Sequence, residues 1–141
     1  MRVRCIRDRI EELPEQIRKW IKPTYMNYAD DYPLNFVKGN EYIVYGIHFW
    51  DNHPFYFLCD SPTDTYPVPH YAGFFEIIDD KLSCGWKLVH QVEKEGYSNT
   101  ALLYKKWAED QMFYTNLVEG NEEEIAIFKQ YKNEMDKEAN Y

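Results

Sequence analysis

The chain of 141 residues lacks most of the features by which protein classes are recognised from sequence. Its three cysteines are odd in number and widely spaced, so they predict no disulfide framework of the secreted kind. Its six glycines are scattered and form no phosphate-binding loop. No apolar run suits a signal peptide or a transmembrane helix, and the opening stretch MRVRCIRDRIEELPEQ is charged throughout. We therefore expect a cytoplasmic protein without membrane attachment.

Basic residues are scarce beyond the N-terminal segment. The chain has 16 lysines and arginines against 24 aspartates and glutamates, which gives a net charge of −8. Residues 1–22 carry +3, so the remainder carries −11. An acidic body repels phosphate backbones, which argues against nucleic-acid binding, and it attracts basic proteins and speeds encounter with them. Ordinary solubility is the alternative explanation of this charge.

Aromatic residues are in excess, at 18% of the chain with 13 tyrosines. A tyrosine can fill a core while its hydroxyl stays at the wet edge, and tyrosines are also favoured at binding surfaces. We expect about a quarter of them to contribute to binding and the rest to packing. With 45% hydrophobic residues, the chain is long enough to bury a core without disulfides or metal, so we expect a single domain over residues 1–141.

The N-terminal residues predict a short strand and then a helix. Residues 2–8 begin with an alternation of polar and apolar side chains. Pro14 suits the first turn of a helix, and Pro23 is expected to end it. The apolar face of this helix would comprise Ile17, Trp20 and Ile21. One helix over residues 3–21 is the alternative, but Pro14 in its interior would cost about 3 kcal/mol.

The centre of the chain predicts an antiparallel hairpin. Residues 41–50 and 55–60 are rich in β-branched and aromatic residues, and Asp51-Asn52-His53-Pro54 between them resembles a turn. Both faces of the first strand are largely apolar, which suits a strand covered on both sides. Gly46 is expected to mark a bend or bulge within it.

Further strands and loops follow from the pattern of turn residues. Residues 23–40 and the proline-rich residues 61–73 are predicted to be loops. Residues 74–78 and 86–92 are predicted strands, which brings the total to about five short strands.

The last third of the chain predicts two helices. Ser98-Asn99 is expected to cap the first of them. That helix would carry Leu103, Tyr104 and Trp107. Residues 119–121 break the chain, and three glutamates from Glu122 onward begin a final helix. The sequence thus predicts an α+β fold: a small, strongly bent antiparallel sheet or SH3-like barrel, with an N-terminal helix and two C-terminal helices.

The residue types that usually carry catalysis are present but poorly arranged. His48, Asp51, His53 and Cys59 fall close together without the spacing of a zinc site. Cys59 or Cys84 would need a partner such as His70 or His90, and neither cysteine has a nucleophile context. We therefore predict no catalytic residue, no metal and no cofactor.

Acidic and aromatic residues gather instead at the predicted strand ends and loops. Aromatic anchors ringed by carboxylates suit a surface that binds a basic protein. The predicted contacts are Trp50, Asp51, Asp60, Asp64, Tyr66, Asp79 and Asp80. The alternative is that the rings face inward and the acids only solvate the surface.

The block KGNEYIVYGIHFWDNHPFYFLCDS…YPVPHYAGFFEIIDDKLSCGWKL, over residues 38–90, carries a resemblance. Its Tyr-x-Val-Tyr strand, its Tyr-x-x-x-Asp strand and its Phe-Glu-x-x-Asp…Trp segment are similar to those of small bacterial immunity proteins of polymorphic-toxin and contact-dependent inhibition systems. The resemblance implies an SH3-like sheet and a cognate toxin as partner, often a basic nuclease held by steric blockade and charge. It assigns no contact residue.

These observations favour a non-enzymatic acidic binding protein, an immunity-type inhibitor of a basic toxin. Two other classes stay open. One is a small hydrolase-like enzyme that uses His70 or Cys84 beside the proline-rich loop, and the other is an SH3-like module that binds a peptide. The sequence leaves the oligomeric state undetermined.

Overall fold

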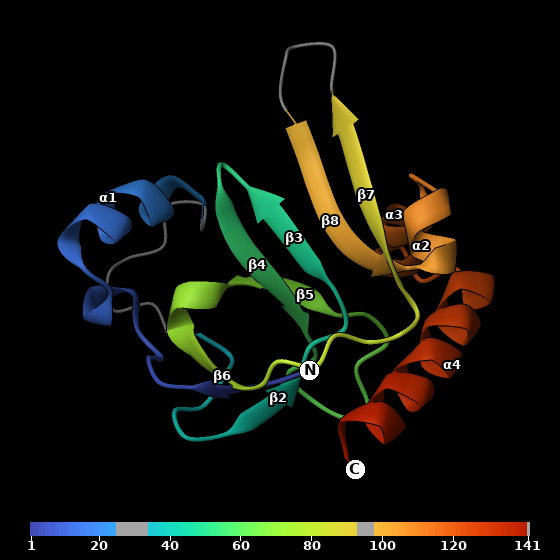
Figure 1. The fold of residues 1–141 in the computed structure, drawn as a ribbon, viewed down its shortest axis with the longest axis horizontal. Coiled ribbons are helices and arrows are strands. Elements are labelled where there is room, and N and C mark those ends of the chain that lie inside the picture. The colour runs from blue at the N-terminus through green and yellow to red at the C-terminus, as the bar shows by residue number, and fades with distance from the viewer. Residues whose placement is uncertain (25–33, 93–97, 141) are drawn as a thin grey trace.

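The protein has an α+β fold, as the sequence predicts, in a computed structural model that describes residues 1–24, 34–92 and 98–140. Two antiparallel sheets, one of three strands and one of five, are accompanied by an N-terminal helix and by helices near the C-terminus (Figure 1). Across these residues the sheets stay open, so the barrel form of the prediction is not found.

The smaller sheet has the order β2-β1-β6 and contains the first strand of the chain. Its strands are β1 (Arg2–Cys5), β2 (Glu41–Ile43) and β6 (Phe75–Asp79). Val3 pairs with Tyr42 on one side and with Ile77 on the other. The alternative of one helix over residues 3–21 is therefore wrong, because the backbone of β1 is held in both ladders.

The N-terminal helix α1 spans Glu15–Thr24 and follows a short 3₁₀ turn, η1 (Ile10–Glu12). Pro14 precedes α1, as predicted, and its carbonyl accepts the backbone N–H of Arg18 at 2.9 Å. The helix continues through Pro23 into Thr24, the last residue described in this segment, so the prediction that Pro23 ends it is wrong. Proline lacks a backbone N–H, so its presence in a helix removes one backbone hydrogen bond. The predicted loop 23–40 lies partly outside the described residues.

The larger sheet has the order β5-β4-β3-β8-β7. Its strands are β3 (Ile47–Trp50), β4 (His53–Leu58), β5 (Val68–Tyr71), β7 (Trp86–Val92) and β8 (Ser98–Tyr104). The predicted hairpin is present as β3 and β4, joined by Asp51 and Asn52. Both turn residues have positive φ, 49° and 66°, as a two-residue type I′ turn requires.

The predicted strand over residues 41–50 is in fact two strands in different sheets. β2 belongs to the smaller sheet and β3 to the larger one. The chain passes between them at Gly46, where a Cβ atom would lie 2.9 Å from Cδ2 of Leu103. The expected bend at Gly46 is therefore confirmed, and close approach to its neighbours is the reason that glycine stands there.

The predicted loop over residues 61–73 contains a strand that the sequence analysis missed. Residues Val68–Tyr71 form β5, and Ala72–Phe74 continue as a 3₁₀ turn, η2. Pro69 is tolerated because β5 is an edge strand of its sheet. The prolines predict a loop, and the chain instead forms an edge strand here.

The predicted helix beginning at Ser98-Asn99 is wrong, because residues Ser98–Tyr104 form β8. This strand lies between β3 and β7 and buries Ala101 and Leu103. Pairing on both edges outweighs the local capping signal. Three helices follow instead of the two predicted: α2 (Lys105–Glu109), α3 (Phe113–Val118) and α4 (Glu122–Ala139).

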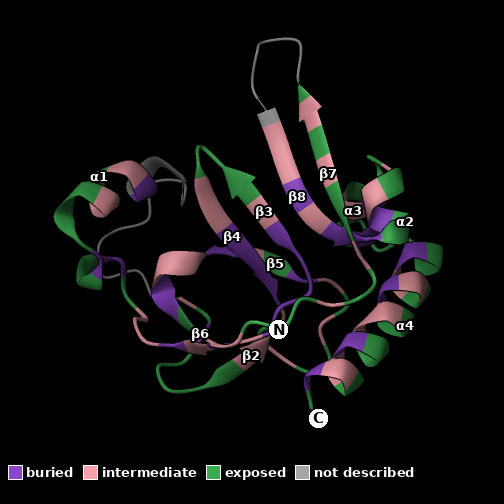
Figure 2. Ribbon diagram, in the orientation of Figure 1, coloured by how far each residue is buried: buried purple, intermediate pink, exposed green. Residues whose placement is uncertain are grey.

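The start of α4 agrees with the prediction. The side chain of Asn121 caps it by accepting the backbone N–H of Glu123 at 3.1 Å, and three glutamates occupy its first turn. Phe128 and Met135 are the buried members of its apolar stripe. Figure 2 shows the buried residues concentrated on the strands of the larger sheet and on one side of α4.

The core consists of two clusters of buried side chains. One, which includes Val3, Ile10 and Phe74, packs between the two sheets and the N-terminal segment. The other, which includes Trp107 and Phe128, lies under α2, α3 and α4. Trp86 packs against both clusters. The two sheets are thereby held in one continuous packing arrangement.

Candidate functional site

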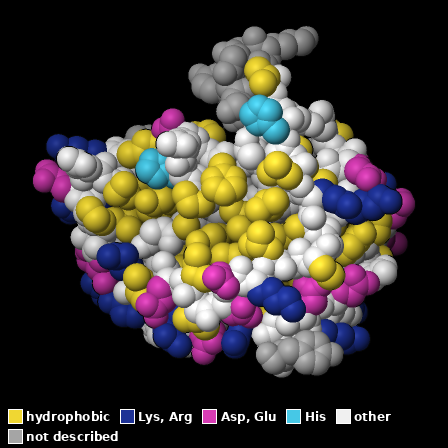
Figure 3. All heavy atoms as spheres, viewed as in Figure 1, with side chains coloured by type: hydrophobic (Ala, Val, Ile, Leu, Met, Phe, Trp, Pro, Cys, Tyr) yellow, Lys and Arg dark blue, Asp and Glu magenta, His cyan; other side chains and the backbone are white. Residues whose placement is uncertain are grey.

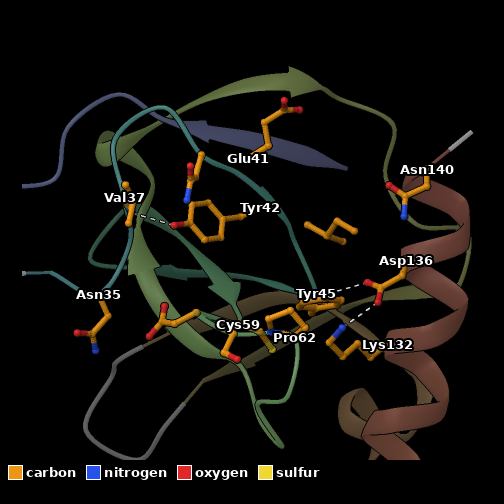
Figure 4. Close-up of a pocket in the computed structure, with 14 residues that line it drawn as sticks. Asn35, Val37, Glu41, Tyr42, Tyr45, Cys59, Pro62, Lys132, Asp136 and Asn140 are labelled. Carbon is orange, nitrogen blue, oxygen red and sulfur yellow. Dashed lines mark hydrogen bonds and ion pairs between the residues drawn. The ribbon is translucent and has the colours of Figure 1, made fainter.

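A pocket of about 420 Å³ lies where β2, the loop after β4 and the second half of α4 meet (Figure 4). Three stretches of chain that are distant in sequence form its walls: residues 35–45, 59–62 and 132–140. Its volume is within the range of roughly 300–1,000 Å³ that is common for ligand pockets. The pocket is lined by Asn35, Val37, Asn40, Glu41, Tyr42, Ile43, Tyr45, Cys59, Asp60, Ser61, Pro62, Lys132, Asp136 and Asn140.

The wall formed by α4 is a network of three polar side chains. The hydroxyl of Tyr45 donates a hydrogen bond to Oδ1 of Asp136 at 2.6 Å. Nζ of Lys132 pairs with Oδ2 of the same carboxylate at 2.8 Å and lies 5.3 Å from the centre of the Tyr45 ring. Lys132 and Asp136 are one helical turn apart, which brings both side chains to the same face of α4. The charge of Asp136 is thereby largely balanced within the protein.

Burial holds two other ionisable groups that line the pocket, the Cys59 thiol and the Tyr45 hydroxyl, in their neutral forms. It raises the pKa of the Cys59 thiol to about 12, with nearby carboxylates adding to the effect and Lys132 opposing it. Burial, together with the hydrogen bond to Asp136, also raises the pKa of the Tyr45 hydroxyl above its ordinary value. A thiol with so high a pKa is protonated at neutral pH and is a poor nucleophile.

The opposite rim is the loop that follows β4, and Asp64 shapes it. Oδ2 of Asp64 accepts the backbone N–H groups of Asp60 and Ser61 at 2.9 and 3.0 Å. The side chain of Asp64 is therefore used to fix the loop backbone. This fixed backbone places Asp60 at the pocket, where its side chain is 26% exposed.

The carboxylate of Asp60 has an unusual neighbour in the buried His70. Nε2 of His70 lies 3.6 Å from Oδ1 of Asp60, just beyond hydrogen-bond distance. Within the described part of the chain neither ring nitrogen of His70 has a hydrogen-bond partner, and its ring meets that of Phe36 edge-on at 5.0 Å. The carboxylate of Asp60 therefore lies beside the buried ring of His70 on one side and stays partly open to solvent.

Glu41 also lines the pocket, but its carboxylate forms an ion pair outside it. Its carboxylate points away from Asp136 (Figure 4) and pairs with Arg2 of β1 at 3.4 Å. The hydroxyl of Tyr42 accepts the backbone N–H of Val37 at 2.9 Å, which fixes the wall opposite α4. Asp60 is therefore the carboxylate best placed to meet a cationic group that enters the pocket.

The structure separates the seven predicted contact residues into three places. Asp60, Asp64 and Tyr66 belong to the loop after β4, and Tyr66 is half-buried against the C-terminal cluster. Trp50 and Asp51 lie at the other end of β4, about 20 Å away for a strand of six residues.

The remaining two predicted contacts, Asp79 and Asp80, lie at the end of β6 in the smaller sheet. There Oδ1 of Asp79 accepts the backbone N–H of Lys81 at 3.1 Å. Asp51 is likewise engaged within the protein, since its carboxylate accepts the indole N–H of Trp20. The predicted residues therefore do not form one continuous surface.

The residues considered for an enzyme lie in separate surroundings. Sγ of Cys84 donates to Oε1 of Glu138 at 3.0 Å, and this contact raises the pKa of the thiol. Cys84 lines a smaller pocket of about 180 Å³ with Met1 and Lys81, whereas His70 is buried in β5. Among the residues with described positions, no three His, Cys, Asp or Glu side chains are grouped to hold a metal ion.

Sequence reasoning missed the α4 wall of the pocket. Lys132 and Asp136 form an i,i+4 pair that is visible in the sequence, but such pairs are common on exposed helix faces. Nothing in the sequence connects them to Tyr45, which precedes Asp136 by 91 residues. Only the packing of α4 beside β2 brings the three together.

Comparison with known proteins gives no relative of this chain: no family model, no curated protein and no solved structure matches it. In the parts of the chain that the structure describes, no helix has both the length and the apolar character needed to cross a membrane.

Proposed function

We propose that the protein is a non-enzymatic, acidic binding protein that neutralises a basic protein partner, in the manner of an immunity-type inhibitor. A lysine or arginine side chain of the partner would enter the pocket beside α4 and meet Asp60. The observation that carries this proposal is the position of Asp60, a partly exposed carboxylate at the rim of a 420 Å³ pocket. A carboxylate can bind a guanidinium through two parallel hydrogen bonds, which gives direction as well as energy.

The pocket is prepared for such a ligand before binding. Asp64 fixes the backbone of the rim, and the Tyr45–Asp136–Lys132 network fixes the opposite wall. Binding to a fixed site loses less conformational entropy than binding to a mobile one. The side-chain amides of Asn35, Asn40 and Asn140 supply further polar groups around the entrance.

Long-range charge adds to this local recognition. The chain carries a net charge of −8, and the part after residue 22 carries −11. A field of this sign accelerates the approach of a basic partner and repels nucleic acid. The same charge therefore supports a protein partner over a nucleic acid.

The chemistry of the cysteines supports an intracellular site of action. Cys5, Cys59 and Cys84 are all free thiols. Burial raises the pKa of the Cys5 thiol to about 11 and that of Cys59 to about 12. Thiols persist in a reducing compartment, which supports our proposal that the protein acts in the cytoplasm.

Co-expression with the product of the gene directly upstream tests the proposal. We expect a stable complex with that protein, and loss of its toxicity to the host cell. The matched variants Asp60→Asn and Glu109→Gln each remove one negative charge, but only Asp60 lines the pocket. Protection should be lost with Asp60→Asn and kept with Glu109→Gln. If the two variants protect the cell equally, the pocket does not bind the partner.

A further inference from the structure

We propose that strand β7 pairs antiparallel with β7 of a second copy of this chain, so that two five-stranded sheets join into one continuous sheet across a twofold axis. The proposal concerns the edge of the larger sheet that lies away from the pocket of Asp60. It is independent of the proposed function.

The first observation is the position of β7 at an open sheet edge. The strand order β5-β4-β3-β8-β7 leaves β5 and β7 as the two edges. The edge β5 is four residues long and contains Pro69, which cannot donate a hydrogen bond to a further strand. The edge β7 is seven residues long and contains no proline. Long edge strands without proline invite pairing with another strand.

The second observation is that this side of the sheet is almost without charge. The three neighbouring strands β3, β8 and β7 contain eighteen residues, of which only Lys87 is charged. At the 28% of charged residues in the whole chain, about five would be expected. Natural edge strands are commonly protected by several charges, so their scarcity here is informative.

The third observation is the exposure of apolar side chains on the same strands. Leu88 is 71% exposed and Val92 is 70% exposed. Leu88 pairs with Leu102, and the half-exposed Phe49 pairs with Thr100. Because Leu102 and Thr100 are two residues apart on β8, all four side chains lie on one face of the sheet. Figure 3 shows hydrophobic side chains gathered over the β3, β4 and β8 region of the view. A partner strand at the edge of β7 would extend this apolar face.

The sequence of β7, Trp-Lys-Leu-Val-His-Gln-Val, is compatible with pairing to itself. With Val89 on the twofold axis, Leu88 lies opposite His90 of the second copy and Trp86 lies opposite Val92. Lys87 lies opposite the neutral Gln91, so no like charges meet. This register uses all seven residues and satisfies the symmetry of a closed dimer.

The chemistry of this edge favours a second copy over the basic partner of the proposed function. A basic partner would be recognised by carboxylates, and β3, β8 and β7 contain none. Two copies of net charge −8 repel each other at long range. Added salt screens that repulsion, so dimer formation should increase with ionic strength, whereas association with a basic partner should decrease.

Sedimentation velocity over a concentration series tests the pairing. The wild-type chain should pass from monomer to dimer as concentration rises. Gln91→Glu places a carboxylate opposite Lys87 twice in the dimer and should tighten it about fivefold, whereas Gln91→Lys should weaken it by about the same factor. The double variant Lys87→Glu/Gln91→Lys restores opposite charges and should dimerise like Gln91→Glu.

Two outcomes overturn the proposal. If the wild-type chain stays monomeric over the whole series, a second copy does not occupy this edge. The same conclusion holds if the monomer binds an unrelated extended peptide there. A dimer whose affinity does not depend on the sign of the charge at position 91 shows that the copies meet elsewhere. Because Lys87 is exposed and Gln91 is only partly buried, all four proteins should fold.

Discussion

The hydroxyl of Tyr45 donates a 2.6 Å hydrogen bond to the carboxylate of Asp136, across 91 residues of chain. Tyr45 lies in the short segment between the two sheets, and Asp136 lies in the last turn of α4. The same carboxylate accepts from Lys132. One carboxylate therefore ties the final helix to the point where the chain changes sheets.

Replacing Tyr45 by Phe should lower stability, because it removes a buried hydrogen bond to a charged acceptor while keeping the ring. The expected loss is about 1.5 kcal/mol in the free energy of unfolding, measured by urea denaturation. Tyr131→Phe is the matched control, since the Tyr131 ring stacks on Tyr104 at 4.1 Å and would keep that contact. Equal effects of the two substitutions would show that the bond to Asp136 contributes little.

Stability should fall steeply as pH rises above about 10. Burial raises the pKa of Tyr45, Tyr104 and Tyr114 above the ordinary tyrosine value. In that range the unfolded chain loses phenol protons that the folded chain keeps, so the unfolded state binds fewer protons and becomes favoured. Each buried tyrosine contributes up to about 1.4 kcal/mol per pH unit.

Denaturation at pH 8 and pH 11, followed together with phenolate absorbance, measures this effect. The buried tyrosines should ionise only as the protein unfolds. If all thirteen tyrosines titrate near pH 10 while the protein stays folded, the burial of these hydroxyls is not as described.

Gly46→Ala should destabilise the fold by about 1 kcal/mol. The new methyl group would lie 2.9 Å from Cδ2 of Leu103 and 3.3 Å from Cδ2 of Phe57, both of them buried, so the core must shift to receive it. Gly85→Ala is the control, because the nearest atom there is Oγ of Ser83 at 3.9 Å. Thermal unfolding should separate the two variants, and a neutral Gly46→Ala would contradict the close packing at this bend.

Asp51→Gly should loosen the attachment of α1 to the β3–β4 turn. Glycine accepts the positive φ at this position without strain, so the expected loss of about 1 kcal/mol reports the missing acceptor of the Trp20 indole. Asn52→Gly, at the neighbouring turn residue, should be neutral or slightly stabilising. Urea denaturation monitored by tryptophan fluorescence measures the stability of both variants. If Asn52→Gly loses more stability than Asp51→Gly, the bond from Trp20 to Asp51 does not account for the effect.

The sequence was sufficient where a local signal determines local structure. The turn at Asp51-Asn52, the bend at Gly46, strand β7 and the start of α4 each depend on side chains within a few residues. It failed where pairing with distant strands decides the outcome. Ser98–Tyr104 carries a helix-cap signal, yet β3 and β7 on either side make it a strand.

The candidate site shows the same division. The place of Asp60 and Asp64 near a strand end predicts them as partner contacts. The structure places Asp60 at the pocket, and its contact with a partner stays a prediction. The carboxylate of Asp64 holds the loop backbone, and its predicted contact with a partner stays a prediction. Tyr45 and Asp136 were missed because only tertiary packing brings them together.

The most direct test of the account is the rate of association with the basic partner, measured by stopped flow over a salt series. Wild-type protein and Glu109→Gln should associate rapidly at low salt and more slowly as salt rises. The association rate of Asp60→Asn should depend less on salt. Its affinity for the partner should be lower by a factor of about ten. If Asp60→Asn and Glu109→Gln give the same rates and affinities at every salt concentration, Asp60 does not receive the partner and the central claim is wrong.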